Sequence, residues 1–137
     1  MTIDYFIRKQ ELNLLKIDTN YIREEYFNII NSNARLIGLI GARGVGKTTL
    51  LFQYIKTNTK KCLYMSGDDI EFTNQKLYNL VDEFYSLGGR VVVIDEVHKY
   101  SNWAQETKNI YDSFPDLTIR ISGSSMLNIL YEKLMLR

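Results

Sequence analysis

The chain has 137 residues, 45% of them hydrophobic and 24% charged, which is ordinary for a globular domain with one hydrophobic core. Its 17 basic and 16 acidic side chains leave a net charge of +1, so there is no global electrostatic reason to expect a nucleic-acid or membrane partner. No run approaches the roughly 20 apolar residues that span a membrane, and the single cysteine, Cys62, excludes an internal disulfide, so we expect a cytoplasmic protein.

Residues 1–34 predict a helical segment that precedes the main domain, residues 35–137. The stretch 3–17 is typical of one helix, and the side chains of 18–20 are suitable N-caps for a second helix. In this second helix we expect one apolar face, because four apolar side chains recur with helical spacing: Ile22, Tyr26, Ile29 and Ile30.

The segment 41–48 reads G-A-R-G-V-G-K-T and satisfies the pattern G-x-x-x-x-G-K-[ST] of a phosphate-binding loop. The apolar run 36–40 leads into it as a strand and the stretch 48–56 leads out as a helix, which is the setting that the motif needs. A loop that bends around a phosphate turns its backbone N–H groups inward, and glycines keep side chains out of the way. The sequence therefore predicts a nucleotide phosphate site formed by Gly41, Ala42, Arg43, Gly44, Val45, Gly46, Lys47, Thr48 and Thr49.

Individual side chains of this loop have separate predicted roles. Lys47 supplies a mobile positive charge for the β- and γ-phosphates, and the Thr48 hydroxyl is placed to ligate Mg²⁺. The start of the following helix adds unpaired N–H groups and a positive dipole end. Arg43 occupies a variable position, where a solvated side chain is favoured over a catalytic one.

The middle of the chain continues with a strand at 62–65 and a turn at 66–69. Asp68 and Asp69 in this turn could face a Mg²⁺ site, although acids before a helix are more often caps. The helix that follows ends at Gly88-Gly89. Its apolar face is predicted to contain Leu77, Leu80, Val81 and Phe84.

Residues 91–96 read V-V-V-I-D-E, and a strand that is apolar on both faces is typical of a buried parallel strand. Acids at its C-terminal end lie where ligands bind in open α/β sheets. We interpret this run as a Walker B motif, in which Asp95 holds Mg²⁺ directly or through water. Glu96 then orients or deprotonates the attacking water. For the nearby His98, a loop or packing role is favoured over a relay of nucleotide state.

The last third of the chain predicts a helix, a strand and a turn. The helix ends before Pro115, the only proline, and Trp103 is expected to anchor it in the core. The strand 117–122 contains Arg120, which does not fit a buried central strand unless that face is open or a carboxylate pairs with it. The turn S-G-S-S at 122–125 leads into a final helix with Met126, Leu127, Leu130 and Leu134.

Strands that alternate with helices predict βαβ units and therefore an α/β fold with a parallel sheet. Right-handed crossovers bring the C-terminal ends of such strands to one edge of the sheet. Both motifs are therefore expected to meet at that edge.

Three runs, G-A-R-G-V-G-K-T-T-L-L, V-V-V-I-D-E-V-H-K-Y-S-N-W and I-S-G-S-S, resemble the prokaryotic AAA-type ATPases. The resemblance covers residues 35–125 and is greatest to a group whose ATPase domain precedes a C-terminal domain of unknown function. It implies the three-layer α/β/α fold of P-loop NTPases, a sheet ordered 5-1-4-3-2, and ATP as the nucleotide. The sequence contains no N-K-x-D guanine pattern, in agreement with ATP.

The resemblance also implies roles for individual residues. Thr49 would contact the α-phosphate, and a polar residue after the fourth strand would sense or orient the γ-phosphate. Ser124 is the first choice for that residue, with Ser122 and Ser125 as alternatives, and a capping role for these serines is equally favoured. The expected catalytic residues are thus Lys47, Glu96 and Ser124, and the expected Mg²⁺ ligands are Thr48 and Asp95.

The sequence departs from this family after the fourth strand, because it stops at Arg137. We expect a truncated form or a fragment, with strand order 1-4-3-2 and without the fifth strand, the helical lid or a second sensor arginine. The first strand then becomes a sheet edge prone to association, and without a lid water is poorly excluded. Weak binding and very slow hydrolysis are the expected consequences.

Two functions remain open from the sequence. The favoured one is Mg²⁺-dependent ATP hydrolysis, coupled to a missing domain, a second copy of the chain or a partner protein. The alternative is a module that binds nucleotide without hydrolysing it. A small-molecule kinase would need an acceptor site and a lid that we do not find. DNA handling, defence, transport and regulation are all compatible with the sequence, and so is a nucleic-acid partner.

Overall fold

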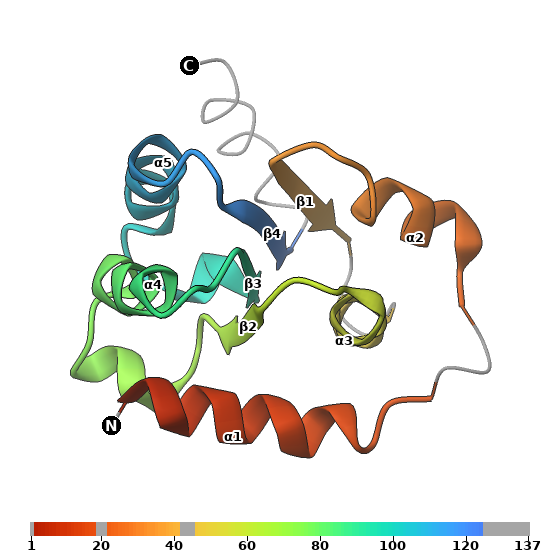
Figure 1. Ribbon diagram of the computed structural model, residues 1–137, viewed down its shortest axis with the longest axis horizontal. Coiled ribbons are helices and arrows are strands. Elements are labelled where there is room, and N and C mark those ends of the chain that lie inside the picture. Colours follow the sequence, from red (N-terminus) through yellow and green to blue (C-terminus); the bar gives the residue numbers. More distant parts are fainter. Residues whose placement is uncertain (1, 19–21, 42–45, 125–137) are drawn as a thin grey trace.

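The computed structural model describes residues 2–18, 22–41 and 46–124 (Figure 1). The predicted final helix and residues 42–45 of the phosphate-binding loop lie outside these ranges. The elements in chain order are α1 (Thr2–Leu14), α2 (Glu24–Ile30), β1 (Leu36–Ile40), α3 (Lys47–Thr57), β2 (Cys62–Ser66), the 3₁₀ turn η1 (Ile70–Thr73), α4 (Leu77–Ser86), β3 (Val91–Asp95), the 3₁₀ turn η2 (Val97–Lys99), α5 (Trp103–Ser113) and β4 (Thr118–Gly123).

The four strands form one parallel sheet in the order β1-β4-β3-β2, which confirms the predicted order 1-4-3-2. At its carboxyl edge the register places Leu39 opposite Ser122, and Ser66 opposite Asp95. The strand ends that carry the two motifs therefore lie at the same edge, as the α/β interpretation predicted.

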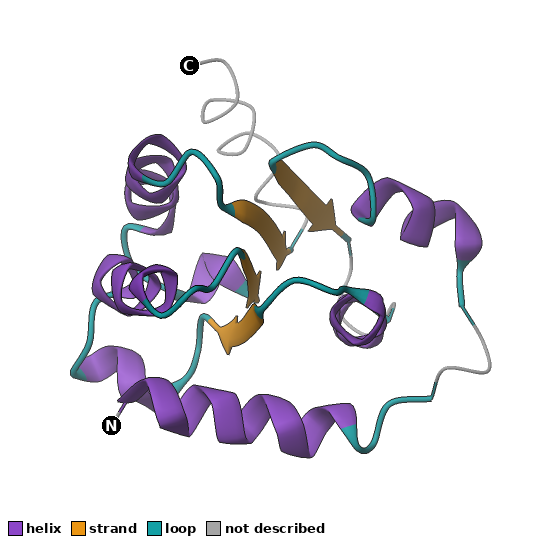
Figure 2. Cartoon of the chain, viewed as in Figure 1, coloured by secondary structure: helices purple, strands orange, loops and turns teal. Residues whose placement is uncertain are grey.

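Helices cover both faces of the sheet, which gives the three-layer architecture of P-loop NTPases (Figure 2). On one face α4 and α5 pack in a core that includes Leu80, Phe84, Ile110, Val92 and Ile94. On the other face α2 and α3 pack in a core that includes Ile30, Leu51, Ile55, Val91 and Val93. All five residues of β3 are buried, as its unbroken apolar run predicted.

Local signals in the sequence place most helix ends correctly. The helix α4 buries the four predicted apolar side chains, and Gly88 follows it at φ +95°, a left-handed conformation that glycine adopts without steric cost. The helix α5 stops two residues before Pro115, and its first residue, Trp103, is buried in the core. These predictions are confirmed.

The helix α1 runs along the free edge of β2, at the bottom of the molecule in Figure 1. The side-chain amide of its Gln10 forms hydrogen bonds with the β2 backbone, as the backbone of a neighbouring strand would. The side-chain oxygen accepts from the Tyr64 N–H at 2.6 Å, and the amide nitrogen donates to the Cys62 carbonyl at 3.1 Å. Because unpaired edges invite association, α1 protects this side of the sheet.

Replacing Gln10 with alanine should lower the free energy of unfolding by about 2 kcal/mol, because a strand N–H and a strand carbonyl both lose their partner in a buried position. Urea denaturation measures this change. The matched control is Asn13→Ala, which removes an exposed amide bond to the Lys9 carbonyl within α1. Equal effects of the two substitutions would contradict the proposed edge protection.

The second helix differs from its prediction in length and in the face that it buries. It begins only at Glu24, and its N-cap, Arg23, makes no side-chain capping bond. Ile30 is fully buried, but Tyr26 is 50% exposed and Ile29 is 53% exposed. The predicted apolar face is therefore wrong, because this short helix touches the core mainly through its C-terminal end.

Arg120 has an explanation that the sequence did not offer. Its side chain is 1% exposed and lies on the α2 face of β4. The guanidinium donates to the carbonyls of Ile30 at 2.6 Å, Ser32 at 2.8 Å and Ala34 at 2.8 Å. This face of β4 is therefore not open, and none of these contacts is with a carboxylate. Instead the Arg120 guanidinium binds carbonyls at the negative end of α2.

Candidate functional site

The two described ends of the phosphate-binding loop lie at the carboxyl end of β1. Gly46 has φ +90°, which favours glycine, and immediately precedes the first residue of α3. The Lys47 ammonium donates to the Gly41 carbonyl at 2.6 Å, so it closes the loop across its base. Ala42, Arg43, Gly44 and Val45 lie outside the described residues.

Asp95, at the end of β3, is the centre of a cluster of hydroxyl groups from two neighbouring strands and one helix. The Thr48 hydroxyl at the start of α3 donates to Asp95 Oδ2 at 2.6 Å. The Ser122 hydroxyl on β4 donates to Asp95 Oδ1, and the Tyr64 hydroxyl on β2 donates to Oδ2 at 2.6 Å. The structure therefore brings together the two expected Mg²⁺ ligands, Thr48 and Asp95, although they are 47 positions apart in the chain.

Tyr64 is a member of this cluster that the sequence analysis did not identify. Its ring packs against Phe52 of α3, with centroids 4.2 Å apart. Burial, with the nearby Asp95 carboxylate, raises the pKa of Tyr64, so the phenol stays protonated and donates. Alternate residues of a strand share one face, so Tyr64 lies on the same face as Ser66, the residue opposite Asp95. Only the pairing of β2 with β3 would have indicated this contact.

Replacing Tyr64 with phenylalanine should lower the free energy of unfolding by about 2 kcal/mol, because the ring remains while a buried carboxylate loses a short hydrogen bond. Thermal or urea unfolding followed by circular dichroism measures the change. Tyr78→Phe is the matched control, since that hydroxyl bonds Ser113 in an exposed position. A loss in Tyr64→Phe no larger than in the control would show that the phenol does not stabilise Asp95.

Glu96 is held in an uncommon backbone conformation next to this cluster. It has φ +51°, a left-handed value rare outside glycine and often found at functional sites. Its N–H donates to Ser122 Oγ at 3.1 Å, and its carboxylate forms an ion pair with Lys99 at 3.0 Å. A Cβ on Gly67 would lie 2.4 Å from the Glu96 carbonyl oxygen, so only glycine allows this close approach of the β2 loop.

The candidate sensor serines and the two acids after β2 lie in different surroundings. Ser122, the alternative sensor, is buried against Asp95, whereas the backbone N–H of Ser124 donates to His98 Nδ1 at 3.4 Å. Ser125 lies outside the described residues. Asp69 caps η1 by accepting from the Glu71 N–H, as a capping role predicts, and the Asp68 carboxylate lies 3.7 Å from Lys99.

A family model described as an AAA domain matches residues 33–135. The chain belongs to the AAA domain family. It is therefore a nucleotide-binding domain of the ATPase type. The segment 2–32, which includes α1 and the Gln10 contact, precedes the matched region.

This AAA domain is also similar to parts of longer proteins. It is 29% identical over 127 residues to an uncharacterized protein of Methanocaldococcus jannaschii, and the match covers 83% of this chain and 27% of that protein. The chain thus spans about a quarter of the length of this curated relative. Among solved structures, it is similar to a structure of Pif1 helicases unwinding forked double-stranded DNA, with 16% identity, 79% and 34% of the two chains covered and a TM-score of 0.49. It is also similar to PCH-2 of C. elegans, with 19% identity, 98% and 38% covered and a TM-score of 0.45.

The donor set of the AAA domain fits Mg²⁺ bound together with a nucleotide. Thr48 and Asp95 offer a hydroxyl and a carboxylate within 2.6 Å of each other, and Mg²⁺ prefers such oxygen ligands. Within the described ranges no three His, Cys, Asp or Glu side chains form a metal-binding group. This agrees with the way Mg²⁺ is usually held at nucleotide sites, by one or two protein oxygens with phosphates and waters.

A cavity of about 340 Å³ lies beside the phosphate-binding loop of the AAA domain. A Cβ on Gly46 would lie 3.5 Å from Arg23 Nη2, so the Arg23 guanidinium reaches the loop from the start of α2. The exposed Tyr26 ring of α2 also borders the cavity, next to apolar side chains of β1 and α3. The cavity is lined by Arg23, Tyr26, Leu39, Ile40, Gly41, Gly46, Lys47 and Leu50. Its volume falls in the usual range for small-molecule sites.

Two further observations concern the AAA domain as a whole. Among its described residues, no helix combines the length and apolar character needed to cross a membrane. The thiol of Cys62 is partly buried, and burial raises the pKa of this group to about 11. The thiol is therefore protonated and unreactive at neutral pH.

Proposed function

We propose that this AAA domain binds ATP and hydrolyses it in the presence of Mg²⁺. The observation that carries the proposal is the contact of Thr48 with Asp95 beside the Lys47 ammonium at the carboxyl edge of the sheet. A bound Mg²⁺ would neutralise negative charge on the phosphate oxygens. Its protein ligands would be Thr48 and Asp95, while Tyr64 and Ser122 hold the Asp95 carboxylate in place.

The residues of the chain divide the remaining tasks. Lys47 exchanges its bond to the Gly41 carbonyl for the β- and γ-phosphate oxygens. Glu96 orients a water and takes its proton as the water oxygen bonds to the γ-phosphorus and the bond to the β–γ bridging oxygen breaks. The nucleoside occupies the cavity bordered by Arg23 and Tyr26, where the tyrosine ring supplies a surface for the base.

The alternative function, nucleotide binding without hydrolysis, is favoured by one observation. The Glu96 carboxylate is engaged by Lys99 at 3.0 Å, and an oxygen that already bonds an ammonium has less capacity to accept a hydrogen bond from a water. Unless Lys99 moves, the domain would bind ATP and release little phosphate. Ser124 keeps its expected role as a γ-phosphate sensor in either function.

Replacing Lys47 with alanine should weaken the binding of a non-hydrolysable ATP analogue with Mg²⁺ by at least about tenfold, because one charge-assisted contact to phosphate is lost. Calorimetric titration of the two proteins measures this difference. The matched control is Lys56→Ala, which removes an exposed lysine from the last turn of the same helix. Equal affinity of the parent and Lys47→Ala would contradict the phosphate site.

We also propose that nucleotide binding and hydrolysis change the conformation of another domain, a second subunit or a partner protein. The greater length of the curated relative supports this proposal. A cytoplasmic location is supported by the single cysteine, since reducing compartments do not favour disulfides.

A further inference from the structure

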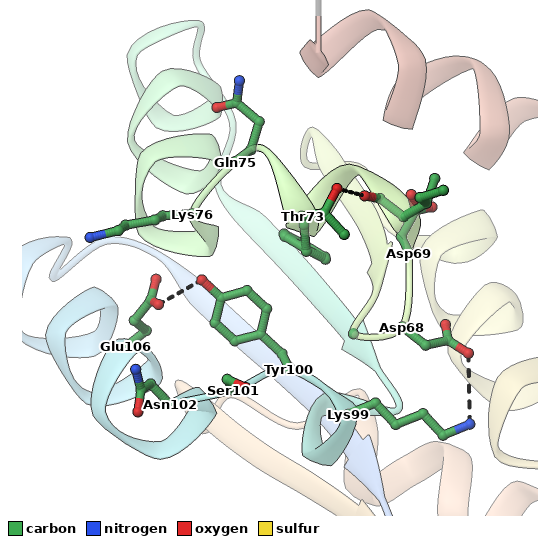
Figure 3. Close-up of a pocket in the computed structure, with 13 residues that line it drawn as sticks. Asp68, Asp69, Thr73, Gln75, Lys76, Lys99, Tyr100, Ser101, Asn102 and Glu106 are labelled. Carbon is green, nitrogen blue, oxygen red and sulfur yellow. Dashed lines mark hydrogen bonds and ion pairs between the residues drawn. The ribbon is translucent and has the colours of Figure 1, made fainter.

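A second cavity, of about 620 Å³, opens where the chain leaves β2 and β3 (Figure 3). It is lined by η1, by Lys99 and Tyr100 after β3, and by residues at the starts of α4 and α5. It shares no lining residue with the cavity beside the phosphate-binding loop. Its volume is sufficient for a small molecule, and the proposed function assigns nothing to it.

The acidic side chains of this cavity already have hydrogen-bond or ion-pair partners. Glu106 accepts from the Tyr100 hydroxyl at 2.6 Å and from a backbone N–H of α4 at 2.9 Å. Asp69 accepts from a lysine and a tyrosine of α1, at 2.6 Å and 3.1 Å, and from a backbone N–H of η1. Asp68 accepts from a serine hydroxyl at 2.5 Å and pairs with Lys99 at 3.7 Å. Two of the three acids are therefore paired with a lysine, and the third, Glu106, accepts two hydrogen bonds from neutral donors.

The groups that are still available in the cavity include one cation. Within the described part of the chain, four lining side chains have no hydrogen-bond or ion-pair partner: Gln75, Lys76, Ser101 and Asn102. An ammonium, a hydroxyl and two amides can all donate to an anion. Figure 3 shows Lys76 on the Tyr100 and Glu106 side of the cavity and Lys99 beside Asp68 on the other. The only charge among these four groups is the Lys76 ammonium, and it favours a ligand with negatively charged oxygens.

Lys99 connects this cavity to the proposed catalytic glutamate. Its ammonium pairs with Glu96 at 3.0 Å and lies 3.7 Å from Asp68, and its side chain is 35% exposed. We propose that the cavity binds a small anionic ligand, through a carboxylate or a phosphate group, and that this ligand competes with Glu96 for Lys99. The expected effect of freeing the Glu96 carboxylate rests on the proposed function, in which Glu96 is the base. The binding of an anion in the cavity does not rest on it.

Anion binding can be tested on the whole chain without nucleotide. Succinate and inorganic phosphate are titrated separately by calorimetry at constant ionic strength, so that general screening does not change. Trp103, the only tryptophan, directly follows the lining residue Asn102, and its fluorescence reports binding at this place. We expect saturable binding of at least one anion, accompanied by a change in Trp103 fluorescence. Saturation by succinate would identify the ligand group as a carboxylate, and saturation by inorganic phosphate would identify it as a phosphate.

Substitutions then locate the binding. Lys99→Gln should weaken it about tenfold, the loss expected for one charge-assisted hydrogen bond, and Asp68→Asn should strengthen it by removing one carboxylate that pairs with the lysine. Lys47→Ala should leave the Trp103 fluorescence response unchanged, because the phosphate-binding loop is not the site that this tryptophan reports. Lys108→Gln is the matched control on α5, where the lysine pairs with Asp112 at 2.5 Å and does not line the cavity. No saturable binding, equal binding by the parent and Lys99→Gln, or loss of the fluorescence response in Lys47→Ala would overturn the proposal.

The link to Glu96 has its own readout. If the parent releases phosphate from ATP, saturating succinate should change that rate in the parent and leave Lys99→Gln unaffected. An unchanged rate in the parent would overturn the competition for Lys99. If the parent releases no phosphate at all, the proposed hydrolysis fails, while the binding titrations still decide whether the cavity takes an anion.

Discussion

Replacing Glu96 with glutamine should lower the rate of phosphate release from ATP at least about 100-fold and leave the affinity for the nucleotide within about twofold of the parent. Glutamine keeps the size of the side chain but cannot take a proton from water. The Glu96 backbone bonds Ser122, which in turn bonds Asp95, so the proposed base lies beside the expected Mg²⁺ ligand. Single-turnover phosphate release and calorimetry with a non-hydrolysable analogue measure the two quantities.

The matched control is Glu11→Gln, an exposed position of α1. Equal rates for Glu96→Gln and the parent would show that Glu96 is not the base. A parent that binds ATP but releases phosphate no faster than Lys47→Ala would instead support the non-hydrolysing module. The same pair of measurements therefore separates the two proposed functions.

Replacing Arg120 with leucine should lower the free energy of unfolding by about 3–5 kcal/mol, because removing one member of a buried polar group leaves the others without partners. Three carbonyls at and after the end of α2 lose a donor in this variant. Such a loss is a large part of the about 5–15 kcal/mol that stabilises a typical domain. Urea unfolding, followed by near-ultraviolet circular dichroism, measures it.

Arg120→Lys should lie between the parent and the leucine variant, since a lysine keeps the charge but lacks the planar set of donors. The matched control, Arg8→Leu, changes an exposed arginine of α1 and should stay within about 0.5 kcal/mol of the parent. A leucine variant as stable as this control would show that the guanidinium contacts do not stabilise the domain.

Features that depend on neighbouring residues could be predicted from the sequence. The phosphate-binding loop, the buried run of β3 and the ends of α4 and α5 all follow from local patterns such as glycine spacing, β-branched content and Pro115. The strand order and the meeting of Thr48 with Asp95 followed from the resemblance and the rule for parallel sheets.

Features that depend on distant residues could not be predicted. Gln10 and Tyr64 look like ordinary helix and strand positions until β2 lies between α1 and β3. Arg120 is understood only once the end of α2 is placed above β4, and the Lys99 contact with Asp68 requires two separate loops to meet. The apolar spacing in α2 was misleading because helical period alone does not say which side meets the core.

The position of β4 between β1 and β3 has a consequence for the order of folding. Within the described sheet, β1 pairs only with β4, and the Arg120 bond to the end of α2 joins residues 90 positions apart. A nascent chain that has emerged only as far as α5 therefore has its β2–β3 pair but no strand to hold β1 and the loop behind it. Loop closure of this length is slow compared with local pairing. We therefore expect the cavity beside the phosphate-binding loop to form after the half of the sheet that carries Asp95.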